Sequence, residues 1–307
     1  MVSRVTNQTM TLAASHNLQA NAARLAKLQE QASTQRAITR PSDDPAATAD
    51  SLRVRAEQRA NAQYGRNIDN ASGWLTTVDS TLAATTAILR RVRDLTVQGA
   101  NDGSMSATAK EAIAIELEGL RNDLLVQANT KYVGRTIFAG NSDSGAAFAV
   151  SYDATATPPY SYTFNATNGS TVERRINAET TVRVDADGSA AFGVDGAGST
   201  SVFALVDGIV SDLRTGTNVG SRLTEIDSRM DAIVGERAAA GARLAQVQRA
   251  QETTMDKSVS LEAQRSGVED IDLGQVILSL KLQEVAYQST LAVTARVLQP
   301  TLMDFLR

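Results

Sequence analysis

Residues 219–265 read VGSRLTEIDSRMDAIVGERAAAGARLAQVQRAQETTMDKSVSLEAQR, and this stretch decides the fold. Steps of four and three residues trace a mostly apolar stripe through Val219, Leu223, Ile226, Met230, Ile233, Arg237, Ala240, Leu244, Val247, Gln251, Thr254, Ser258 and Leu261. Such spacing is typical of a helix packed lengthwise against other helices. No proline interrupts the stretch, and as an α-helix it would extend roughly 70 Å. The pattern predicts a rod, which favours a structural or connecting role.

The composition excludes several kinds of chemistry. Aromatic residues make up only 4% of the 307 residues, so the core must be built from Ala, Leu, Val and Ile, which suits helix-on-helix packing. The chain has no Cys and one His, His16, so a Ser–His–Asp triad or a two-His metal site has too few residues. The net charge of −4 gives no indication of nucleic-acid binding. We expect no cofactor, no metal and no catalytic residue.

Two absences concern the membrane and export. No run approaches the roughly 18 apolar residues of a membrane span, and MVSRVTNQTM at the start lacks the apolar core of a cleavable signal peptide. We therefore expect no membrane contact. The chain should be cytosolic, or exported by a route that uses no such signal.

Three further segments show helical periodicity. Residues 1–36 form a thin, polar stripe that is marginal as a lone helix and needs a partner. Residues 46–100 carry a strict seam of Tyr64, Ile68, Ala71, Leu75, Val78, Leu82, Thr85, Leu89 and Val92, with Trp74 expected at its edge. Residues 106–131 carry Ile113, Leu117, Leu120 and Leu124. The short breaks between the seams predict antiparallel neighbours in a bundle.

The loop before the second helix has strong capping signals. Pro41 disfavours a helical conformation for the residue before it. Asp44 followed by Pro45 is typical of an N-cap and a first helical residue. Asp43 and Asp44 could also suggest a metal site, but adjacent side chains diverge and no further ligand lies near. We expect Pro41, Asp43, Asp44 and Pro45 to form a structural loop and helix cap.

From residue 131 the pattern changes to short β-prone runs. Residues 132–140 predict a hairpin bracketed by glycines. In residues 141–201, Tyr160, Tyr162 and Phe164 alternate, Asn168-Gly169 predicts a hairpin turn to residues 172–176, and Asp187-Gly188 predicts another turn, toward Phe192 and Val194. We expect a small β domain inserted into the helical part.

The chain then returns to helix and ends in a separate terminal segment. Residues 203–213 predict a short helix, and the register of the long seam fails within residues 266–272, which we interpret as a joint. A new stripe begins at Leu273, and further apolar residues widen it: Val276, Leu278, Leu282, Val285, Val293 and Val297. This is more apolar surface than one thin N-terminal helix can cover, which indicates an association site.

The sequence thus predicts a mainly α fold, a long antiparallel helical bundle or coiled-coil rod formed from both chain ends, with a small inserted β domain. Residues 1–40 and 271–307 would form terminal coiled-coil assembly segments. Residues 41–140 and 202–270 would form the bundle core, and residues 141–201 the insertion.

Four motifs, in order along the chain, resemble the flagellin superfamily: Arg4-Val5-Thr6-Asn7, Pro41-Ser42-Asp43-Asp44-Pro45-Ala46-Ala47, Arg91-Val92-Arg93-Asp94-Leu95-Thr96-Val97-Gln98 and Gly134-Arg135-Thr136-Ile137-Phe138-Ala139-Gly140. Within it, RVTNQTM (residues 4–10), IFAG (137–140) and GSAAFGV (188–194) leading into SVFALVDGI (201–209) are most similar to the FlgL family of third hook-associated proteins. That family joins the flagellar hook to the filament.

The resemblance implies a structural role in the bacterial flagellum. The implied partners are a FlgK-type hook-associated protein, flagellin, copies of this chain in a ring, and a flagellar export chaperone. It implies an extracellular location at the hook–filament junction, reached through type III export without a cleaved signal peptide. The assembly interface would be formed by Val5, Leu12, Leu18, Leu25, Leu28, Leu273, Ile277, Leu280, Tyr287, Leu291, Leu298, Leu302 and Phe305.

Three alternatives remain beside the junction role. The chain could be flagellin itself, the self-polymerising filament subunit. It could carry an enzyme in the insertion, although a His-Glu-x-x-His metalloprotease helix is excluded there because the insertion has no His. It could also be a secreted coiled coil or adhesin, which would not explain matching motifs at both ends.

Overall fold

The structure is a computed structural model that describes residues 7–101, 105–155, 158–166, 170–196 and 199–298. By its contacts the chain divides into two units, Met1–Ala60 with Lys257–Arg307, and Asn61–Asp256. Helices α2 (Pro45–Gly99) and α6 (Leu223–Glu269) contribute residues to both units.

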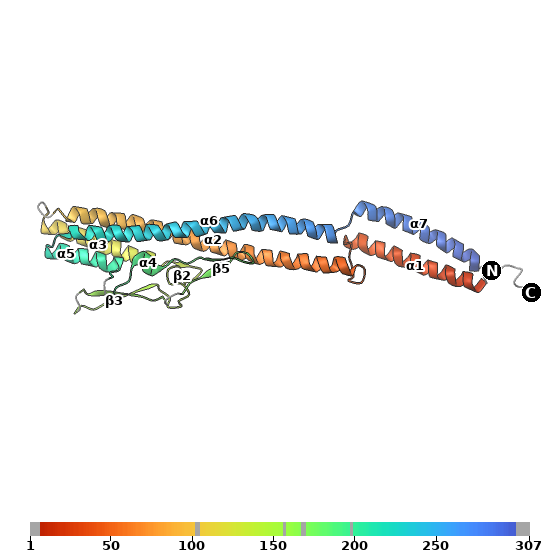
Figure 1. Cartoon of the computed structure of the whole chain (residues 1–307), viewed down its shortest axis with the longest axis horizontal. Coiled ribbons are helices and arrows are strands. Elements are labelled where there is room, and N and C mark those ends of the chain that lie inside the picture. The colour runs from red at the N-terminus through yellow and green to blue at the C-terminus, as the bar shows by residue number, and fades with distance from the viewer. Residues whose placement is uncertain (1–6, 102–104, 156–157, 167–169, 197–198, 299–307) are drawn as a thin grey trace, which may run out of the picture. The chain divides into compact units, whose positions relative to one another are not determined.

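The first unit consists of helices only, in the part that the structure describes. Helix α1 (Asn7–Thr34) packs against α7 (Leu273–Leu298), and the start of α2 packs against the end of α6 (Figure 1). Gln58 Nε2 donates to Glu262 Oε2 at 2.9 Å. Val54 and Leu261 supply the buried apolar contacts of this end of α2 and α6.

The second unit is built on an antiparallel pair formed by the rest of α2 and α6. Ion pairs between Asp79 and Arg237 at 2.8 Å, and between Arg93 and Asp227 at 2.7 Å, fix their opposite directions. Helices α3 (Ala107–Ala128) and α5 (Val202–Thr215) and the 3₁₀ turn η1 (Val219–Arg222) complete the helical part (Figure 1).

The seams expected from the sequence form the core of this unit. On the side of η1 and α6 every seventh residue is buried, through Val219, Ile226, Ile233, Ala240 and Val247. On α2 the buried seam is Ile68, Ala71, Leu75, Val78, Leu82, Thr85, Leu89 and Val92. Thr85 fits among apolar neighbours because its hydroxyl donates to the Thr81 carbonyl at 2.8 Å, so no buried hydroxyl is unsatisfied there. The expected mainly α fold with long helices and a small β insertion is confirmed.

The β region that follows α3 contains short antiparallel hairpins and one short helix, and all but its first hairpin lie within the insertion, residues 141–201. Its elements are β1 (Lys131–Tyr132), β2 (Arg135–Thr136), β3 (Phe148–Tyr152), β4 (Tyr160–Phe164), β5 (Glu173–Arg175), β6 (Thr181–Arg183) and α4 (Gly188–Phe192). The strands pair as β1–β2, β3–β4 and β5–β6, each a sheet of two strands. The first sheet turns through Val133 and Gly134, both with positive φ.

Two local expectations for the insertion were wrong. The alternating run of β4 does not pair with residues 172–176, because β4 pairs with β3 and β5 with β6. The turn expected at Asn168-Gly169 lies outside the described residues. Asp187 caps α4 instead of turning between strands, since its carboxylate accepts from the Ser189 and Ala190 amides.

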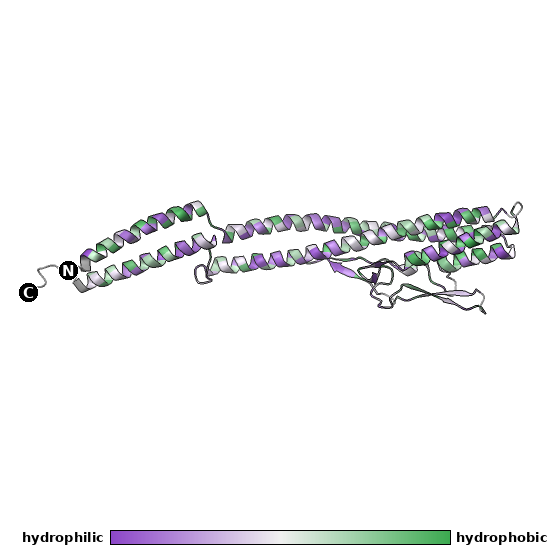
Figure 2. Cartoon of the chain, turned by 180° about the vertical axis from the view of Figure 1, so that it is seen from behind, coloured by the Kyte–Doolittle hydropathy of each residue, from purple (hydrophilic) through white to green (hydrophobic). Residues whose placement is uncertain are grey.

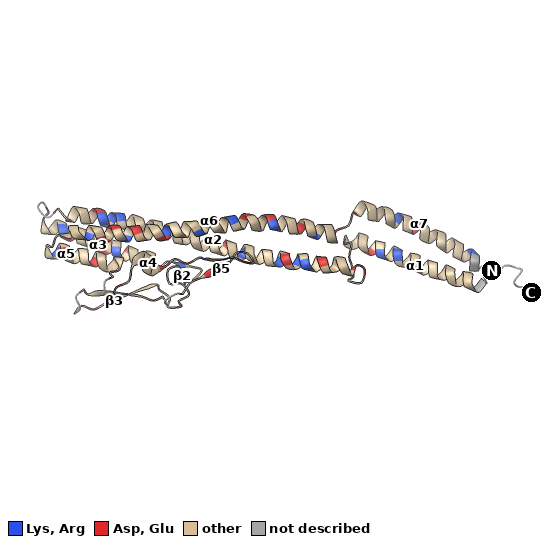
Figure 3. Ribbon diagram, viewed as in Figure 1, with Lys and Arg blue, Asp and Glu red and all other residues tan. Residues whose placement is uncertain are grey.

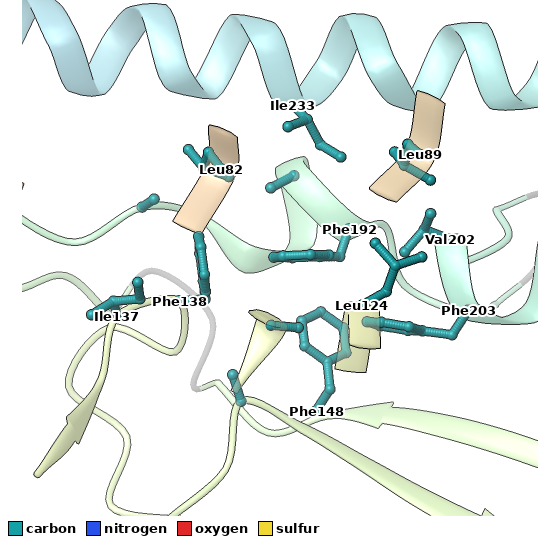
Figure 4. Close-up of a cluster of buried hydrophobic side chains, with 14 of the residues drawn as sticks. Leu82, Leu89, Leu124, Ile137, Phe138, Phe148, Phe192, Val202, Phe203 and Ile233 are labelled. Atoms are coloured by element: carbon teal, nitrogen blue, oxygen red, sulfur yellow. The ribbon is translucent and has the colours of Figure 1, made fainter. Parts of the chain in front are cut away.

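An aromatic cluster attaches the insertion to the bundle (Figure 4). The ring of Phe148, on β3, lies 5.1 Å from that of Phe203, on α5, and Phe138 meets Phe192 edge-on at 5.0 Å. These distances are those of favourable aromatic pairs. Burying four large rings concentrates much of the limited aromatic content of the chain at one junction.

A buried ion pair lies beside this cluster. Asp207 on α5 accepts from Arg121 Nη1 and from the Tyr162 hydroxyl, each at 2.6 Å. Burial raises the pKa of the Asp207 carboxyl, and the two donors offset part of that cost. The Arg121 guanidinium also lies over the Tyr160 ring, at 4.3 Å from its centroid. Strand β4 is therefore held to α3 and α5 by charge as well as by apolar contact.

Trp74 is more deeply placed than the sequence suggests. Its exposed fraction is 1%, and it lies under the insertion instead of at the edge of a helical seam. Tyr132 covers it at 5.5 Å and the Arg174 guanidinium at 5.7 Å. These two side chains come from β1 and β5, so only the folded β region brings them to α2.

Phe203→Ala should strongly destabilise the second unit, because it removes the ring that joins α5 to the insertion. We expect a loss of about 3–5 kcal/mol in the free energy of unfolding. Urea unfolding followed by Trp74 fluorescence measures it, since the single Trp lies in the same unit. The matched control is Tyr152→Ala, which removes an exposed ring and should cost less than about 1 kcal/mol. Equal losses in the two variants would contradict this account of the junction.

Candidate assembly surface

The terminal helices α1 and α7 form a pair whose ends have clear causes. Helix α7 begins after Asp272, whose side chain accepts from the Gln275 amide at 3.1 Å and acts as an N-cap. Helix α1 ends where Gln35 adopts a positive φ of 56°, a conformation that stops a helix. Of the 26 residues of α7, three are charged: Lys281, Glu284 and Arg296 (Figure 3).

The seam between α1 and α7 is partly polar. Asn21 Nδ2 donates to Thr290 Oγ1 at 2.8 Å. Gln283 Nε2 donates to the Asn21 carbonyl and to Asn21 Oδ1, each at 3.2 Å. Thr294 is buried in the same helix pair, and its hydroxyl has no hydrogen-bond partner among the described residues. Polar groups thus occupy positions that apolar residues usually fill in a helix pair.

The apolar residues of α7 lie mainly on its outer side. The exposed fractions are 62% for Leu278, 65% for Leu282, 61% for Val285 and 60% for Val293. Figure 2 shows the hydrophobic colour recurring along this helix. These four residues, which we call the outer face of α7, contact no other helix closely enough to be covered. Exposed apolar patches of this kind on soluble proteins mark association sites.

The structure divides the predicted interface residues between the seam and the surface. Half-buried positions in the α1–α7 pair are Leu18, Leu25, Leu28, Leu280 and Tyr287. Exposed positions are Leu12, Leu273, Ile277 and Leu291. Val5, Leu302 and Phe305 lie outside the described residues, and Leu298 ends α7 with a side chain that is not described.

The interface predicted from the sequence lacks two groups of residues. The outer face of α7 belongs to the widened apolar surface of the C-terminal segment, but the predicted interface residues follow a single stripe. Asn21, Gln283 and Thr290 had no recognisable signal as a group, because their contacts depend on how the two helices are aligned.

The predicted cap residues lie in the exposed loop before α2. Asp44 Oδ1 accepts from the Ala47 amide at 2.9 Å, with Pro45 as the first helical residue. Asp43 accepts from Lys27 Nζ at 3.2 Å and from the Thr39 hydroxyl at 3.1 Å, and these hydrogen bonds hold its pKa below the ordinary value. Pro41 is exposed at the start of this turn.

Glu269, the last residue of α6, connects three segments of the first unit. Its side chain, only 5% exposed, accepts from Arg55 Nε at 2.6 Å and Nη2 at 2.7 Å, and also from the Ser51 hydroxyl. Its backbone carbonyl accepts from the Ala37 amide at 2.7 Å, in the connection between α1 and α2. The bonds from Arg55, opposed by burial and assisted by Ser51, lower the pKa of Glu269 to about 2. This residue therefore fixes α2 and the α1–α2 connection at the point where α6 gives way to α7.

The described residues include no cluster typical of metal binding. No group of three His, Asp or Glu side chains is placed to hold a metal ion in that part of the chain. None of the described helices is long and apolar enough to cross a membrane.

The chain is similar to known flagellar proteins. Residues 5–143 match the family of the bacterial flagellin N-terminal helical region, so this segment resembles the N-terminal part of flagellin. Along most of its length it resembles flagellar hook-associated protein 3: it is 25% identical to that of Salmonella typhimurium over 86% of this chain and 87% of the relative. The Escherichia coli protein of the same name is 24% identical over the same shares.

Solved structures share the fold. A putative flagellar hook-associated protein from Vibrio parahaemolyticus has a TM-score of 0.65 and 20% identity, covering 74% of this chain and all of that chain. The flagellar junction protein FlgL from Legionella pneumophila has a TM-score of 0.58 and 17% identity, covering 72% of this chain and all of that chain. These structures show that the fold is shared, and the similarity in sequence to hook-associated protein 3 confirms the resemblance to the FlgL family.

Glu269→Gln should weaken the first unit in a pH-dependent way. At neutral pH we expect a loss of about 2 kcal/mol, the size of hydrogen bonds to a charged group, reduced because Arg55 is partly exposed. The folded pKa of about 2 is below the ordinary 4.5, so the contribution is complete above pH 4.5 and disappears as pH falls through about 2. Hydrogen exchange of peptides from residues 45–60 and 257–269 measures the difference between the two proteins.

The control is Glu262→Gln, the same change at an exposed carboxylate that pairs with Arg265 at 2.7 Å, as Glu269 does at 3.4 Å. It should leave the hydrogen exchange of both segments nearly unchanged, because an exposed ion pair contributes little to stability. A difference for Glu269→Gln that stayed constant from neutral pH down to about pH 3 would refute the assigned role of its ionised carboxylate.

Proposed function

We propose that this chain is a structural subunit that joins the flagellar hook to the flagellin filament. Its similarity to hook-associated protein 3 over most of both chains supports this role. The proposed role is mechanical and involves no catalysis, in keeping with structural relatives. Its proposed location is the extracellular flagellum.

The observation that carries the proposal is the outer face of α7. Two helices that form a self-sufficient pair bury their apolar residues against each other. Here Leu278, Leu282 and Val285 are exposed and point away from α1. Roughly 25 cal/mol is gained per Å² of apolar surface removed from water. Several leucine-sized side chains therefore provide a substantial driving force for docking against other subunits.

The proposed division of labour follows the chain. Residues 1–40 and 271–307 serve as assembly segments, with the interface residues predicted from the sequence and the outer face of α7. Residues 41–140 and 202–270 act as the supporting helical core. Residues 141–201 form an insertion that is separated from both assembly segments by the residues of the helical core. The cap residues Pro41, Asp43, Asp44 and Pro45 set the path of the chain between the first two parts.

The proposed partners are a FlgK-type hook-associated protein on the hook side and flagellin on the filament side. Copies of this chain would lie side by side in a ring. Such contacts are heterologous, because each subunit offers different surfaces to its two neighbours. Before assembly, an export chaperone would cover the apolar face of the C-terminal segment.

Flagellin is the second candidate function. The Bacillus subtilis protein named flagellin is 24% identical over 96% of both chains, so similarity alone does not separate the two roles. A filament subunit and a junction subunit differ in polymerisation. A filament subunit adds to a filament made of identical subunits, and a junction subunit does not.

Leu282→Glu should abolish assembly while leaving the isolated protein folded. Leu282 is 65% exposed, so a carboxylate there is solvated in the monomer but would be buried unpaired in an assembled interface. We expect cells producing only this variant to carry hooks without filaments and to shed flagellin. Electron microscopy and the flagellin content of the medium measure this, with circular dichroism of the purified variant as the test of folding. Gln288→Glu, at an exposed polar position of α7, should assemble normally.

Two results would contradict the proposal. Normal filaments on Leu282→Glu cells would refute the role of the outer face of α7. Purified parent protein that elongated filament fragments without a hook would identify a filament subunit, not a junction protein.

A further inference from the structure

The contacts of Asn21 are specific to one alignment of α1 and α7. Its side chain is bonded to Gln283 and Thr290, which lie seven residues apart and therefore on one face of α7, two turns from each other. Asn21 thus sits between these two positions, as a residue in a coiled coil sits in the hole formed by its partner helix.

The hydrogen bonds at this site satisfy both partners. Thr290 Oγ1 accepts from Asn21 and donates to the Ala286 carbonyl at 2.8 Å, so the direction of its hydroxyl is fixed. Asn21 uses its amide as a donor and its side-chain and backbone oxygens as acceptors. A single residue therefore makes three hydrogen bonds to the opposite helix.

A slip of one turn would remove these bonds. Moving α7 in one direction would place Leu280 and Tyr287 beside Asn21, and moving it in the other would place Tyr287 and Thr294 there. Either register loses the amide donor of Gln283, and the first offers Asn21 no aliphatic hydroxyl. Asn21 and Gln283 are half-buried in the helix pair, so a slipped register that leaves their polar groups without these partners is less stable.

The apolar part of the seam cannot by itself select the alignment. Leu18, Leu25 and Leu28 are all only half-buried, and the half-buried apolar residues of α7, Val276, Leu280 and Tyr287, recur at intervals of one or two turns. Apolar contact is non-directional and changes little when one leucine replaces another. Hydrogen bonds, by contrast, fail at once when the atoms move by a turn.

We infer that Asn21, with Gln283 and Thr290, sets the register of the terminal helix pair. In this role a polar residue is retained at some cost in stability because it specifies one alignment. The register in turn fixes where the outer face of α7 stands along α1. The inference deepens the junction role proposed above and depends on it only for its consequence in assembly.

Spin-label distances in the full-length chain test the register directly. Because the chain has no Cys, labels at Ala13→Cys and Gln275→Cys, both exposed, report on α1 and α7 alone. With Asn21 opposite the midpoint of Gln283 and Thr290, these sites are offset by roughly 30 Å along the pair. If one helix slides along the other, the distance between the labels therefore changes by almost the whole displacement.

The parent should give one narrow distance by double electron–electron resonance. Asn21→Leu, which replaces the amide with an apolar side chain of similar size, should add a second population displaced by about 5 Å, one helical turn. Thr290→Val, which removes only the hydroxyl, should add the same population in smaller amount. Asn17→Leu, the same change at an exposed position one turn away, should keep the single parent distance.

Three outcomes would overturn the inference. One is a single unshifted distance in Asn21→Leu. Another is a broad distribution in the parent, which would mean that the isolated chain has no fixed register. The last is a broad distribution confined to Asn21→Leu and Thr290→Val, which would mean that these residues hold the helices together and do not select their alignment. None of these results depends on whether flagella assemble, so the junction role is tested separately.

Discussion

The terminal helix α7 has more apolar surface than its partner α1 can cover. This imbalance is the constraint on which the rest of the structure depends. Leu278, Leu282 and Val285 are exposed, while polar side chains occupy the seam between the two helices. Exposed apolar surface of this kind favours association. The helices of the second unit have a different character, since their seam residues are buried.

The two kinds of helix pair differ in how they are stabilised. In the second unit a residue of the η1–α6 stretch is buried at every seventh position from Val219 to Val247, and small side chains let the helices approach. The α1–α7 pair relies on directional bonds at Asn21 and on the anchoring of the α6 end by Glu269. Apolar seams give stability without specifying much detail, whereas hydrogen bonds give alignment at modest net energy. In the assembly role proposed above, a terminal helix pair benefits from the second kind, because its alignment is specified while little stability is lost if it rearranges.

The insertion shows why local sequence patterns are insufficient in β regions. Its alternating runs correctly predict a small β insertion but not the strand partners, since β4 pairs with β3, the strand before it. Phe148 of β3 packs on Phe203, and Tyr162 of β4 bonds to Asp207, so contacts with α5 hold both strands of this sheet. Asp187-Gly188 reads equally well as a turn or as a helix start, because in both cases the carboxylate accepts from nearby amides. The choice was made by the packing of Phe192 under Phe203.

The sequence by itself determined the helices, their seams, the failing register near residues 266–272 and the surplus of apolar residues at the C-terminal end. These features are periodic, and periodicity follows from the fixed geometry of a helix whatever its surroundings. Only the tertiary structure decided that Trp74 is covered and that Asn21 lies between Gln283 and Thr290. The same holds for Glu269, which joins the end of α6 to α2 and to the segment between α1 and α2. Each of these depends on side chains far apart in the sequence, such as Arg55 and Glu269, and no local pattern records which distant residue will be opposite. The sequence thus predicted the apolar surface of α7 but not the direction in which it points. That direction depends on which residues of α7 pack against α1.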